Sequence, residues 1–236
     1  MRLDGAKILV TGGAKRIGKK ICEAFAKEGA KIIIHFNQSE ADAKALLQKL
    51  EGKEKGHSIW QCDLSKDFKI DKKIHKILPF DILINNASIY EPKQIINETE
   101  SEIQKNMSVN FFSPLFLAIE FAKYSTNGLI INILDECVAR LSKDEGSYQL
   151  SKKCLLWATE ILALQLAPKI RVNAIAPGAV LPPDDKPEMR LVKQKHETPL
   201  RKTATLDDIV SACIFLAKND SITGQTIFID GGRHLL

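Results

Sequence analysis

Short runs of apolar residues alternate along this chain with longer segments in which apolar residues recur at helical spacing. Continuous apolar runs are typical of strands that are buried on both faces of a parallel sheet. They predict seven strands, at Lys7–Val10, Lys31–Phe36, Ser58–Gln61, Asp81–Asn85, Leu129–Ile133, Arg171–Ile175 and Thr226–Ile229. Because strands and helices alternate and such crossovers are right-handed, we expect an α/β fold with a doubly wound parallel seven-stranded sheet and helices on both faces.

The segments between the strands predict the helices. These cover Ile17–Glu28, Ser39–Leu50, Asp67–Leu78, Ser101–Tyr124, Ser147–Leu166 and Thr205–Leu216. The helix that begins at Ser39 opens with a sequence that has the form of a capping box, and Thr205-Leu206-Asp207-Asp208 is expected to cap the last helix. Pro114 is expected to kink the helix that contains it, because proline has no amide hydrogen. Residues 177–200 show no periodicity and are rich in proline and charge, which predicts a mobile substrate lid.

Composition places the chain among ordinary globular proteins. It has 236 residues, of which 44% are hydrophobic and 27% charged. No stretch rich in proline, glycine or serine divides it, so we expect residues 1–236 to form one domain. No apolar run approaches the roughly 20 residues of a membrane helix, and the first residues do not resemble a signal peptide. We therefore expect a cytoplasmic protein with no membrane partner.

Charge and cysteine content narrow the possible partners. The chain carries 34 Lys+Arg against 29 Asp+Glu, a net charge of +5. The lysines are dispersed among acidic residues, which favours a solvated surface over a nucleic-acid interface. The five cysteines are scattered and contain no CxxC pair, so we expect reduced thiols. The five histidines show no metal-ligand spacing, which predicts surface or strand roles and no metal site.

A glycine-rich sequence, Thr11-Gly12-Gly13-Ala14-Lys15-Arg16-Ile17-Gly18, lies between the first strand and the first helix. Gly12 permits a tight turn, and Gly18 lets the helix pack close to the strand. The amino-terminal end of that helix offers free N–H groups to a pyrophosphate. The sequence therefore predicts a single-domain Rossmann fold that binds a dinucleotide, with a simple strand-to-helix turn as the alternative.

The cofactor predicted by this turn and by the second strand is NADPH. Arg16 stands where the third glycine of the usual pattern lies, and no acidic residue follows the second strand to bind a ribose 2′-hydroxyl. Lys15, Arg16 and Ser39 are donors that suit a 2′-phosphate. Asn37 and Gln38 replace the usual basic residue of the second strand, so NAD stays open as an alternative.

Polar residues also follow the third and fourth strands. Asp63 is a candidate to accept the adenine amino group, or else to cap a helix. The sequence Asn85-Asn86-Ala87-Ser88 comes where ligands bind in such sheets, at the carboxyl end of a strand. A plain turn is the alternative for that sequence.

Tyr148 and Lys152 are four residues apart on one predicted helix, so they share a face. A phenol has a pKa near 10, and a neighbouring ammonium group, helped by a positively charged nicotinamide, is expected to lower the pKa of Tyr148. Tyr148 would then supply a proton while a cofactor supplies hydride, and Lys152 could hold the ribose hydroxyls. This pair predicts oxidoreductase chemistry.

The order of these motifs, together with Asn110, Pro177-Gly178 and Asp230-Gly231-Gly232, resembles that of the short-chain dehydrogenase/reductase family over essentially the whole chain. That family normally has a serine thirteen residues before the tyrosine, whereas this chain has Asp135. Asp135, Arg16 and Ser88 together are similar to the pteridine reductases, and the carboxyl-terminal Asp230–Leu235 to bacterial dihydromonapterin reductases.

The resemblance implies a role for particular residues. Catalytic roles fall to Tyr148, Lys152, Asp135 and Asn110, with Asn110 holding the water of a proton relay. Cofactor contacts fall to Gly12, Lys15, Arg16, Ile17, Gly18, Asn37, Ser39, Asp63, Leu64, Asn86, Ala87, Ser88, Lys152, Pro177 and Gly178. The pterin is expected to stack against Tyr90 and to contact Arg16, Ser88, Asp135 and Tyr148. Alternatively, Asp135 caps a turn, Tyr90 is a surface loop residue and Asn110 stabilises the Pro114 kink.

The function predicted is NADPH-dependent reduction of dihydropterins, such as dihydromonapterin or dihydrobiopterin, or of dihydrofolate, to tetrahydro forms. A dihydropterin is reduced at a C=N bond, so a ring nitrogen must be protonated, and an aspartate can orient Tyr148 or relay that proton. A 3-oxoacyl-acyl-carrier-protein reductase and a non-catalytic NADP-sensing protein are the alternatives. The resemblance also implies a homotetramer formed by Ser101–Tyr124 and Ser147–Leu166, with the tail Arg233–Leu236 reaching a neighbouring subunit's site.

Overall fold

The computed structural model describes residues 1–66, 74–180 and 196–236. Its centre is a seven-stranded parallel sheet with the strand order β3-β2-β1-β4-β5-β6-β7. The strands are β1 Lys7–Val10, β2 Lys31–Phe36, β3 Ser58–Gln61, β4 Ile82–Asn85, β5 Gly128–Ile133, β6 Ile170–Pro177 and β7 Thr226–Ile229. The predicted fold class is confirmed. The main difference is β6, which continues to Pro177 beside β7.

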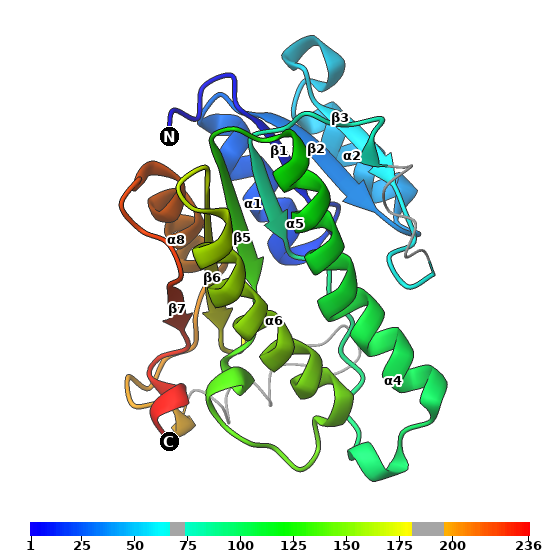
Figure 1. Cartoon of the computed structure of the whole chain (residues 1–236), viewed down its shortest axis with the longest axis vertical. Helices are drawn as coiled ribbons and strands as arrows, with labels where there is room; N and C mark the ends of the chain where they lie inside the picture. The colour runs from blue at the N-terminus through cyan, green and yellow to red at the C-terminus, as the bar shows by residue number, and fades with distance from the viewer. Residues whose placement is uncertain (67–73, 181–195) are drawn as a thin grey trace.

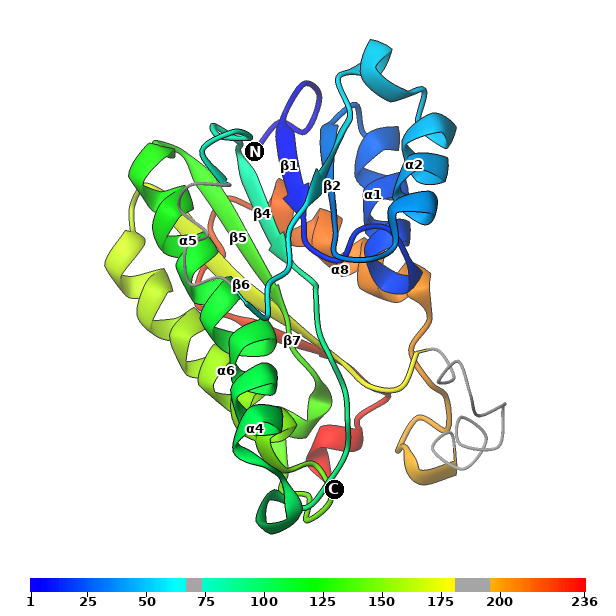
Figure 2. The ribbon, with the colours of Figure 1, turned by 90° about the vertical axis from the view of Figure 1, so that its right-hand side faces the viewer.

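The sheet separates two layers of helices. The helices are α1 Arg16–Lys27, α2 Glu40–Lys49, α4 Glu100–Met107, α5 Ser113–Tyr124, α6 Gly146–Leu166 and α8 Leu206–Lys218. Figure 2 shows α4, α5 and α6 on one face and α1, α2 and α8 on the other. Alternate strand residues serve the two layers, since Val10 packs in one apolar cluster with Phe25 of α1, while Leu9 packs in another with Phe121 of α5.

Strand order reverses between β1 and β4, because the chain first moves outward to β3 and then returns to the other side of β1. Val10 therefore pairs with Ile34 of β2 on one side and with Ile84 of β4 on the other. Open α/β sheets bind ligands at the carboxyl ends of the strands that flank such a reversal. In Figure 1 these ends face the half of the molecule that holds α4 and the C-terminus.

The long helix expected at Ser101–Tyr124 is interrupted. It consists of α4, a π-helical segment at Ser108–Phe112 (η3), and α5. The amide of Ser113 bonds to the carbonyl of Ser108, five residues earlier, and Pro114 opens α5. The irregularity expected at Pro114 thus lies in the turn just before it.

The two predicted helix caps had different outcomes. The cap at Thr205 is confirmed and is a capping box, because Thr205 and Asp208 exchange side-chain-to-backbone hydrogen bonds. Ser39 is the residue before α2, but its side chain makes no capping bond, so that prediction was wrong. The carboxylate of Asp42 instead lies 3.1 Å from Nζ of Lys15 at the start of α1.

Two predicted segments lie largely outside the described residues. Residues 67–73 of the helix expected at Asp67–Leu78, and residues 181–195 of the lid expected at 177–200, are not described. Across the ranges that are described, no helix is long and apolar enough to cross a bilayer.

Candidate active site

The glycine-rich turn between β1 and α1 forms a cradle that only glycine can build. Gly12 has a φ of +61°, and a β-carbon there would lie 3.0 Å from the Cα of Ala87. A β-carbon at Gly18 would lie 2.2 Å from the carbonyl oxygen of Gly12. The turn therefore packs tightly against the start of α1 and the loop after β4. This geometry fits the pyrophosphate of a dinucleotide at the start of α1.

The turn is fixed by hydrogen bonds from β4. Oγ1 of Thr11 accepts the amides of Asn86 and Ala87 at 2.9 and 3.0 Å, and Nδ2 of Asn86 donates to the carbonyl of Thr11 at 2.8 Å. The side-chain amide of Asn86 thus bonds to the backbone of the turn. This bond pattern joins the carboxyl ends of β1 and β4 at the strand-order reversal.

His35 of β2 also holds the turn, a role that the sequence did not indicate. Its ring is buried, and Nδ1 accepts the amide of Gly12 at 3.0 Å while Nε2 lies 3.0 Å from the carbonyl of Cys62. Burial lowers the pKa of His35 to about 4, so the ring is neutral near pH 7. The sequence predicted only an ordinary strand position for His35, whereas its imidazole supports the glycine-rich turn.

Arg16 adopts the left-handed conformation that explains why a glycine is usual at its position. Its φ is +51°, a region that side chains with a β-carbon rarely occupy. Arg16 begins α1 and lines two cavities at the carboxyl edge of the sheet. The structure therefore places this guanidinium between the predicted cofactor and substrate regions.

The first cavity lies beside the glycine turn and has a volume of about 410 Å³. The predicted cofactor residues that line it are Gly12, Lys15, Arg16, Ile17, Gly18, Asn37, Asp63, Leu64, Asn86, Ala87 and Ser88. Ser39 is not among its lining residues. The hydrogen bonds that Oδ1 of Asp63 accepts from Ser65, at 2.6 and 2.9 Å, lower the pKa of Asp63 and form a local turn.

The second cavity has a volume of about 700 Å³ and shares Arg16, Ile17, Asn86 and Ser88 with the first. It brings together the predicted residues Tyr90, Asp135, Tyr148, Lys152, Pro177 and Gly178. Because the two cavities share these residues, they form one groove that extends from the glycine turn to Tyr148. Its size suits a dinucleotide followed by a small ring system.

Tyr148, Asp135 and Lys152 meet at the centre of this groove. The phenol of Tyr148 donates a hydrogen bond to Oδ2 of Asp135 at 2.8 Å, and Oδ1 of Asp135 accepts the amide of Cys137 at 2.8 Å. Nζ of Lys152 donates to the carbonyl of Ile133 at 3.0 Å. Asp135 therefore caps a turn and binds Tyr148 at once, which joins the two roles that the sequence left as alternatives.

Comparison with known proteins agrees with this arrangement. Residues 12–234 match a family model described as enoyl-(acyl carrier protein) reductase. The chain belongs to the short-chain dehydrogenase/reductase family. The family resemblance predicted from the motifs is thereby confirmed, and the protein is an oxidoreductase of this family.

Two solved structures are similar to the whole chain. FolM alternative dihydrofolate reductase 1 from Brucella canis, complexed with NADP, is 34% identical with a TM-score of 0.92, covering 100% of this chain and 96% of that chain. Its counterpart from Brucella suis, also in complex with NADP, is 35% identical with a TM-score of 0.91, covering 100% and 97%. The 3-oxoacyl-[acyl-carrier-protein] reductase FabG of Thermotoga maritima is 28% identical over 98% of this chain and 99% of its own length.

The electrostatics of Tyr148 differ from the expectation for a tyrosine–lysine pair of this family. Burial raises the pKa of Tyr148 well above its usual range, and the negative charge of Asp135 raises it further. Burial lowers the pKa of Lys152, an effect that Asp135 opposes. The protein's own groups thus raise the pKa of Tyr148, whereas the predicted lowering depends on Lys152 and the nicotinamide together and stays a prediction. The phenol stays protonated and is a hydrogen-bond donor.

Asn110, in the π-helical segment, is fully buried and serves the loop after β4. Its Oδ1 accepts the hydroxyl of Ser88 at 3.1 Å and the amide of Ile89 at 3.0 Å, and its Nδ2 donates to the carbonyl of Ile89 at 3.1 Å. Asn110 lines neither cavity with its side chain. Its expected part in a water relay stays a prediction.

The ring of Tyr90 packs against the ring of Tyr148 in the groove. Its ring centroid is 4.7 Å from that of Tyr148 with an interplanar angle of 77°, and its hydroxyl lies 3.5 Å from Oε1 of Glu145. Tyr90 is 39% exposed, so a flat ligand can reach its ring. The position fits the expected stacking role better than that of an isolated surface residue.

Several lining residues were missed by the sequence reasoning. They include Glu136, Arg140 and Glu145, which line the same cavity as Tyr148. Burial raises the pKa of Glu145, and its Oε2 has no hydrogen-bond partner among the described residues. A usable signal was position, because Glu136 directly follows Asp135 and Glu145 lies three residues before Tyr148. In the described part of the chain, no group of three or more His, Cys, Asp and Glu residues is placed to hold a metal ion.

Proposed function

We propose that this protein reduces dihydropterins, of which dihydromonapterin and dihydrobiopterin are the first candidates, to tetrahydro forms with NADPH. The observation that carries the proposal is the hydrogen bond from Tyr148 to Asp135 at the position where the family normally has a serine. A serine polarises a carbonyl oxygen, whereas a carboxyl group next to a phenol can relay protons to a ring nitrogen. Similarity to structures titled alternative dihydrofolate reductase supports the same class of substrate and includes dihydrofolate.

Within this proposal each residue has a separate task. NADPH, once bound along the glycine turn, supplies the hydride. Tyr148, kept protonated by burial and by Asp135, donates a proton to the nitrogen of the substrate C=N bond. Asp135 passes a replacement proton from water to the phenol. Lys152 holds positive charge behind Tyr148, with Nζ 5.9 Å from the centroid of its ring.

Binding of the ligands follows from the groove. Lys15 and Arg16 lie at the cofactor cavity and supply cations for a 2′-phosphate, which favours NADPH over NADH. Tyr90 and Ser88 flank the space where the pterin ring would stack. These roles, with that of residues 177–200 as a lid, belong to the proposal.

The proposal is tested by NADPH oxidation with purified protein. The panel comprises dihydromonapterin, dihydrobiopterin, dihydrofolate, a fully oxidised pterin and a 3-oxoacyl thioester, with NADH in parallel. We expect turnover of at least one dihydro substrate, faster with NADPH than with NADH. Similarity to FabG makes the thioester the second candidate substrate, and turnover of the thioester alone would reject the proposal.

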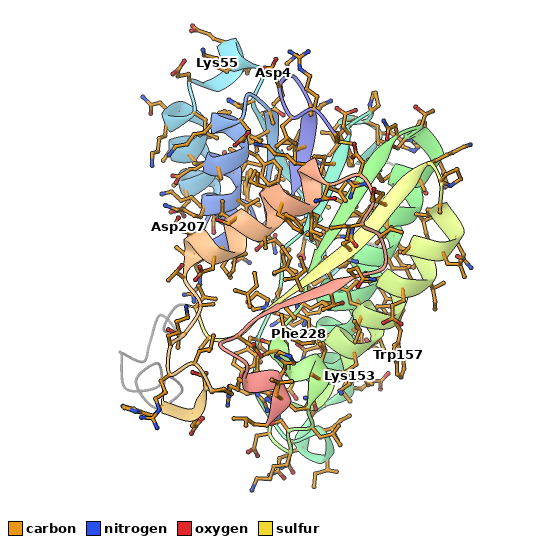
Figure 3. All side chains as sticks on the ribbon, turned by 90° about the vertical axis from the view of Figure 1, so that its left-hand side faces the viewer. Asp4, Lys55, Lys153, Trp157, Asp207 and Phe228 are labelled. Atoms are coloured by element: carbon orange, nitrogen blue, oxygen red, sulfur yellow. The ribbon has the colours of Figure 1, made fainter. Side chains whose placement is uncertain are left out.

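We also propose a homotetramer that acts in the cytoplasm. Leu150, Trp157, Ile161 and Leu164 are exposed by 45–82% and recur at helical spacing along α6. Figure 3 shows Trp157 on the outer side of this helix. An exposed apolar stripe of this kind is typical of a subunit interface. Light scattering should show a tetramer, and Trp157→Glu should yield smaller species, whereas a monomeric wild type would contradict the proposal.

A further inference from the structure

A buried carboxylate next to the catalytic aspartate is held by two arginines. Glu136 has a side-chain exposure of 4% and follows Asp135 directly. Nε and Nη2 of Arg140 donate to its two oxygens at 2.9 and 3.0 Å, and Nη1 of Arg233 donates to Oε1 at 2.7 Å. A buried charge is stable only when it is paired, so these arginines determine where Glu136 lies.

Arg233 is brought to Glu136 by a tightly built carboxyl-terminal turn. Gly231 and Gly232 have φ values of +67° and +85°, and a β-carbon at Gly231 would lie 2.5 Å from the carbonyl of Lys202. The carboxylate of Asp230 accepts the amides of Gly232 and His234 at 2.9 and 2.7 Å. These contacts fix the backbone on both sides of Arg233.

The last turn is also fixed to the edge strand. The ring of His234 stacks on Phe228 of β7 with centroids 4.2 Å apart and an interplanar angle of 18°. Figure 3 labels Phe228 close to the carboxyl-terminal turn, η5 Arg233–Leu235. Arg233 consequently lines the cavity of its own chain. The reach of the tail into a neighbouring subunit's site, which the family resemblance implies, stays a prediction.

The contact with Glu136 extends to the catalytic group. The short helix η4 Glu136–Ala139 packs against η5, and Asp135 is its cap. Oδ1 of Asp135 is held by the amide of Cys137 in the same turn, so the orientation of this turn decides where Oδ2 points. Oδ2 is the atom that accepts the phenol of Tyr148. A displacement of Glu136 would therefore change the Asp135–Tyr148 pair.

We propose that Arg233 is a positioning residue for Asp135: its ion pair with Glu136 holds the η4 turn and thereby the proton relay at Tyr148. The carboxyl-terminal turn is then part of the active site of its own chain. The activity readouts below rest on the proposed dihydropterin reduction, but the exchange readout does not.

The test compares Arg233→Met and Arg233→Lys with the wild type. We expect Arg233→Met to lower kcat for a dihydropterin by about tenfold or more and to change its kcat–pH profile. The KM and the Kd for NADPH should change less than about threefold. Arg233→Lys should recover part of kcat, since an ammonium group can still pair with Glu136. Hydrogen exchange of the amides of residues 135–140 should be faster in Arg233→Met, without any substrate.

Arg171→Met is the matched control. Arg171 joins β6 to the end of α8 through the carbonyls of Leu216 and Ile222, at 3.0 and 3.1 Å, and lines no part of the groove. Its loss should lower Tm but leave kcat and the exchange of residues 135–140 unchanged. A double variant Arg233→Met/Glu136→Gln should lose no more activity than Glu136→Gln alone, because Arg233 is proposed to act on the turn through Glu136, which Arg140 also holds.

Three results would overturn the proposal. The first is a kcat of Arg233→Met within twofold of the wild type. The second is an effect on KM alone, which would make Arg233 a substrate ligand. The third is unchanged hydrogen exchange of the amides of residues 135–140 in Arg233→Met. If the wild type reduces no dihydropterin, the proposed function fails, and the exchange result alone decides whether Arg233 holds the turn.

Discussion

Acidification is expected to destabilise the protein through His35, the buried imidazole that supports the glycine turn. Nδ1 accepts the amide of Gly12, so Nε2 must carry the proton that faces the carbonyl of Cys62. A second proton on Nδ1 would meet the Gly12 N–H and leave that amide without its acceptor. Protonation of His35 should therefore disturb the glycine-rich turn directly.

The magnitude follows from the two pKa values. The pKa of His35 is about 4 in the folded protein, lowered by burial from an ordinary value of 6.5. Between these values the unfolded chain binds a proton that the folded protein does not, so the free energy of unfolding falls as the pH falls. The difference of about 2.5 units at 1.36 kcal/mol each gives about 3 kcal/mol in all. About 2 kcal/mol of this is lost between pH 7 and pH 4.5.

Urea unfolding of the wild type and His35→Asn at these two pH values measures the effect. An asparagine amide oxygen can accept the Gly12 N–H but does not titrate, so the wild type should lose about 2 kcal/mol more than the variant. His57→Asn is the control, because burial also lowers the pKa of His57, which accepts the amide of Ile32 at the other end of the sheet. At pH 4.5 a group with a pKa of about 4 is still mostly unprotonated in the folded protein, so NADPH affinity should differ between the wild type and His35→Asn by less than about twofold. Equal losses of free energy in the wild type and His35→Asn would refute the reasoning.

Three further predictions concern the groove. Asp135→Ser and Tyr148→Phe should each lower dihydropterin turnover at least about 100-fold, with NADPH affinity measured by fluorescence within about threefold of wild type; a parallel loss of affinity would mean that the pair organises the cofactor site instead. Gly18→Ala should weaken NADPH binding in calorimetry at least about tenfold, because its β-carbon would lie 2.2 Å from the Gly12 carbonyl, and unchanged binding would contradict the cradle. Asn110→Ala should cost about 2–3 kcal/mol in urea unfolding, since it removes the hydrogen bonds to the loop after β4, whereas an unchanged midpoint would show that the loop is held otherwise.

The fold could be predicted because its signals are local. The strands are continuous apolar runs, and β5 is buried at every position. The π-helical segment at Ser108–Phe112 could not be predicted, because a shift from i+4 to i+5 hydrogen bonding leaves no distinct pattern of apolar residues. Ser39 makes no capping bond, and its backbone, with a ψ of 53°, is not in the extended conformation that an N-cap residue normally has.

Parts of the candidate site could be predicted where the backbone or the chemistry requires one particular residue type. The glycines of the turn and the Tyr148–Lys152 pair can be identified from spacing, and the family resemblance shows that Asp135 stands where a serine is usual. His35, Glu136 and Arg233 act through partners far along the chain, the last two 97 residues apart. Only folding brings such partners together. The raised pKa of Tyr148 could not be predicted for the same reason, because it results from burial and from the charge of Asp135.

The central claim is that Asp135 makes this family member a reductase of C=N bonds. The most direct measurement is the ratio of kcat/KM for dihydromonapterin or dihydrobiopterin to that for a 3-oxoacyl thioester, with NADPH, in the wild type and in Asp135→Ser. The account predicts a ratio well above one for at least one of the two pterins in the wild type and a fall of at least about 100-fold in kcat/KM for that pterin in the variant. A wild type that prefers the thioester, or a variant that reduces the dihydropterin as well as the wild type does, would contradict it.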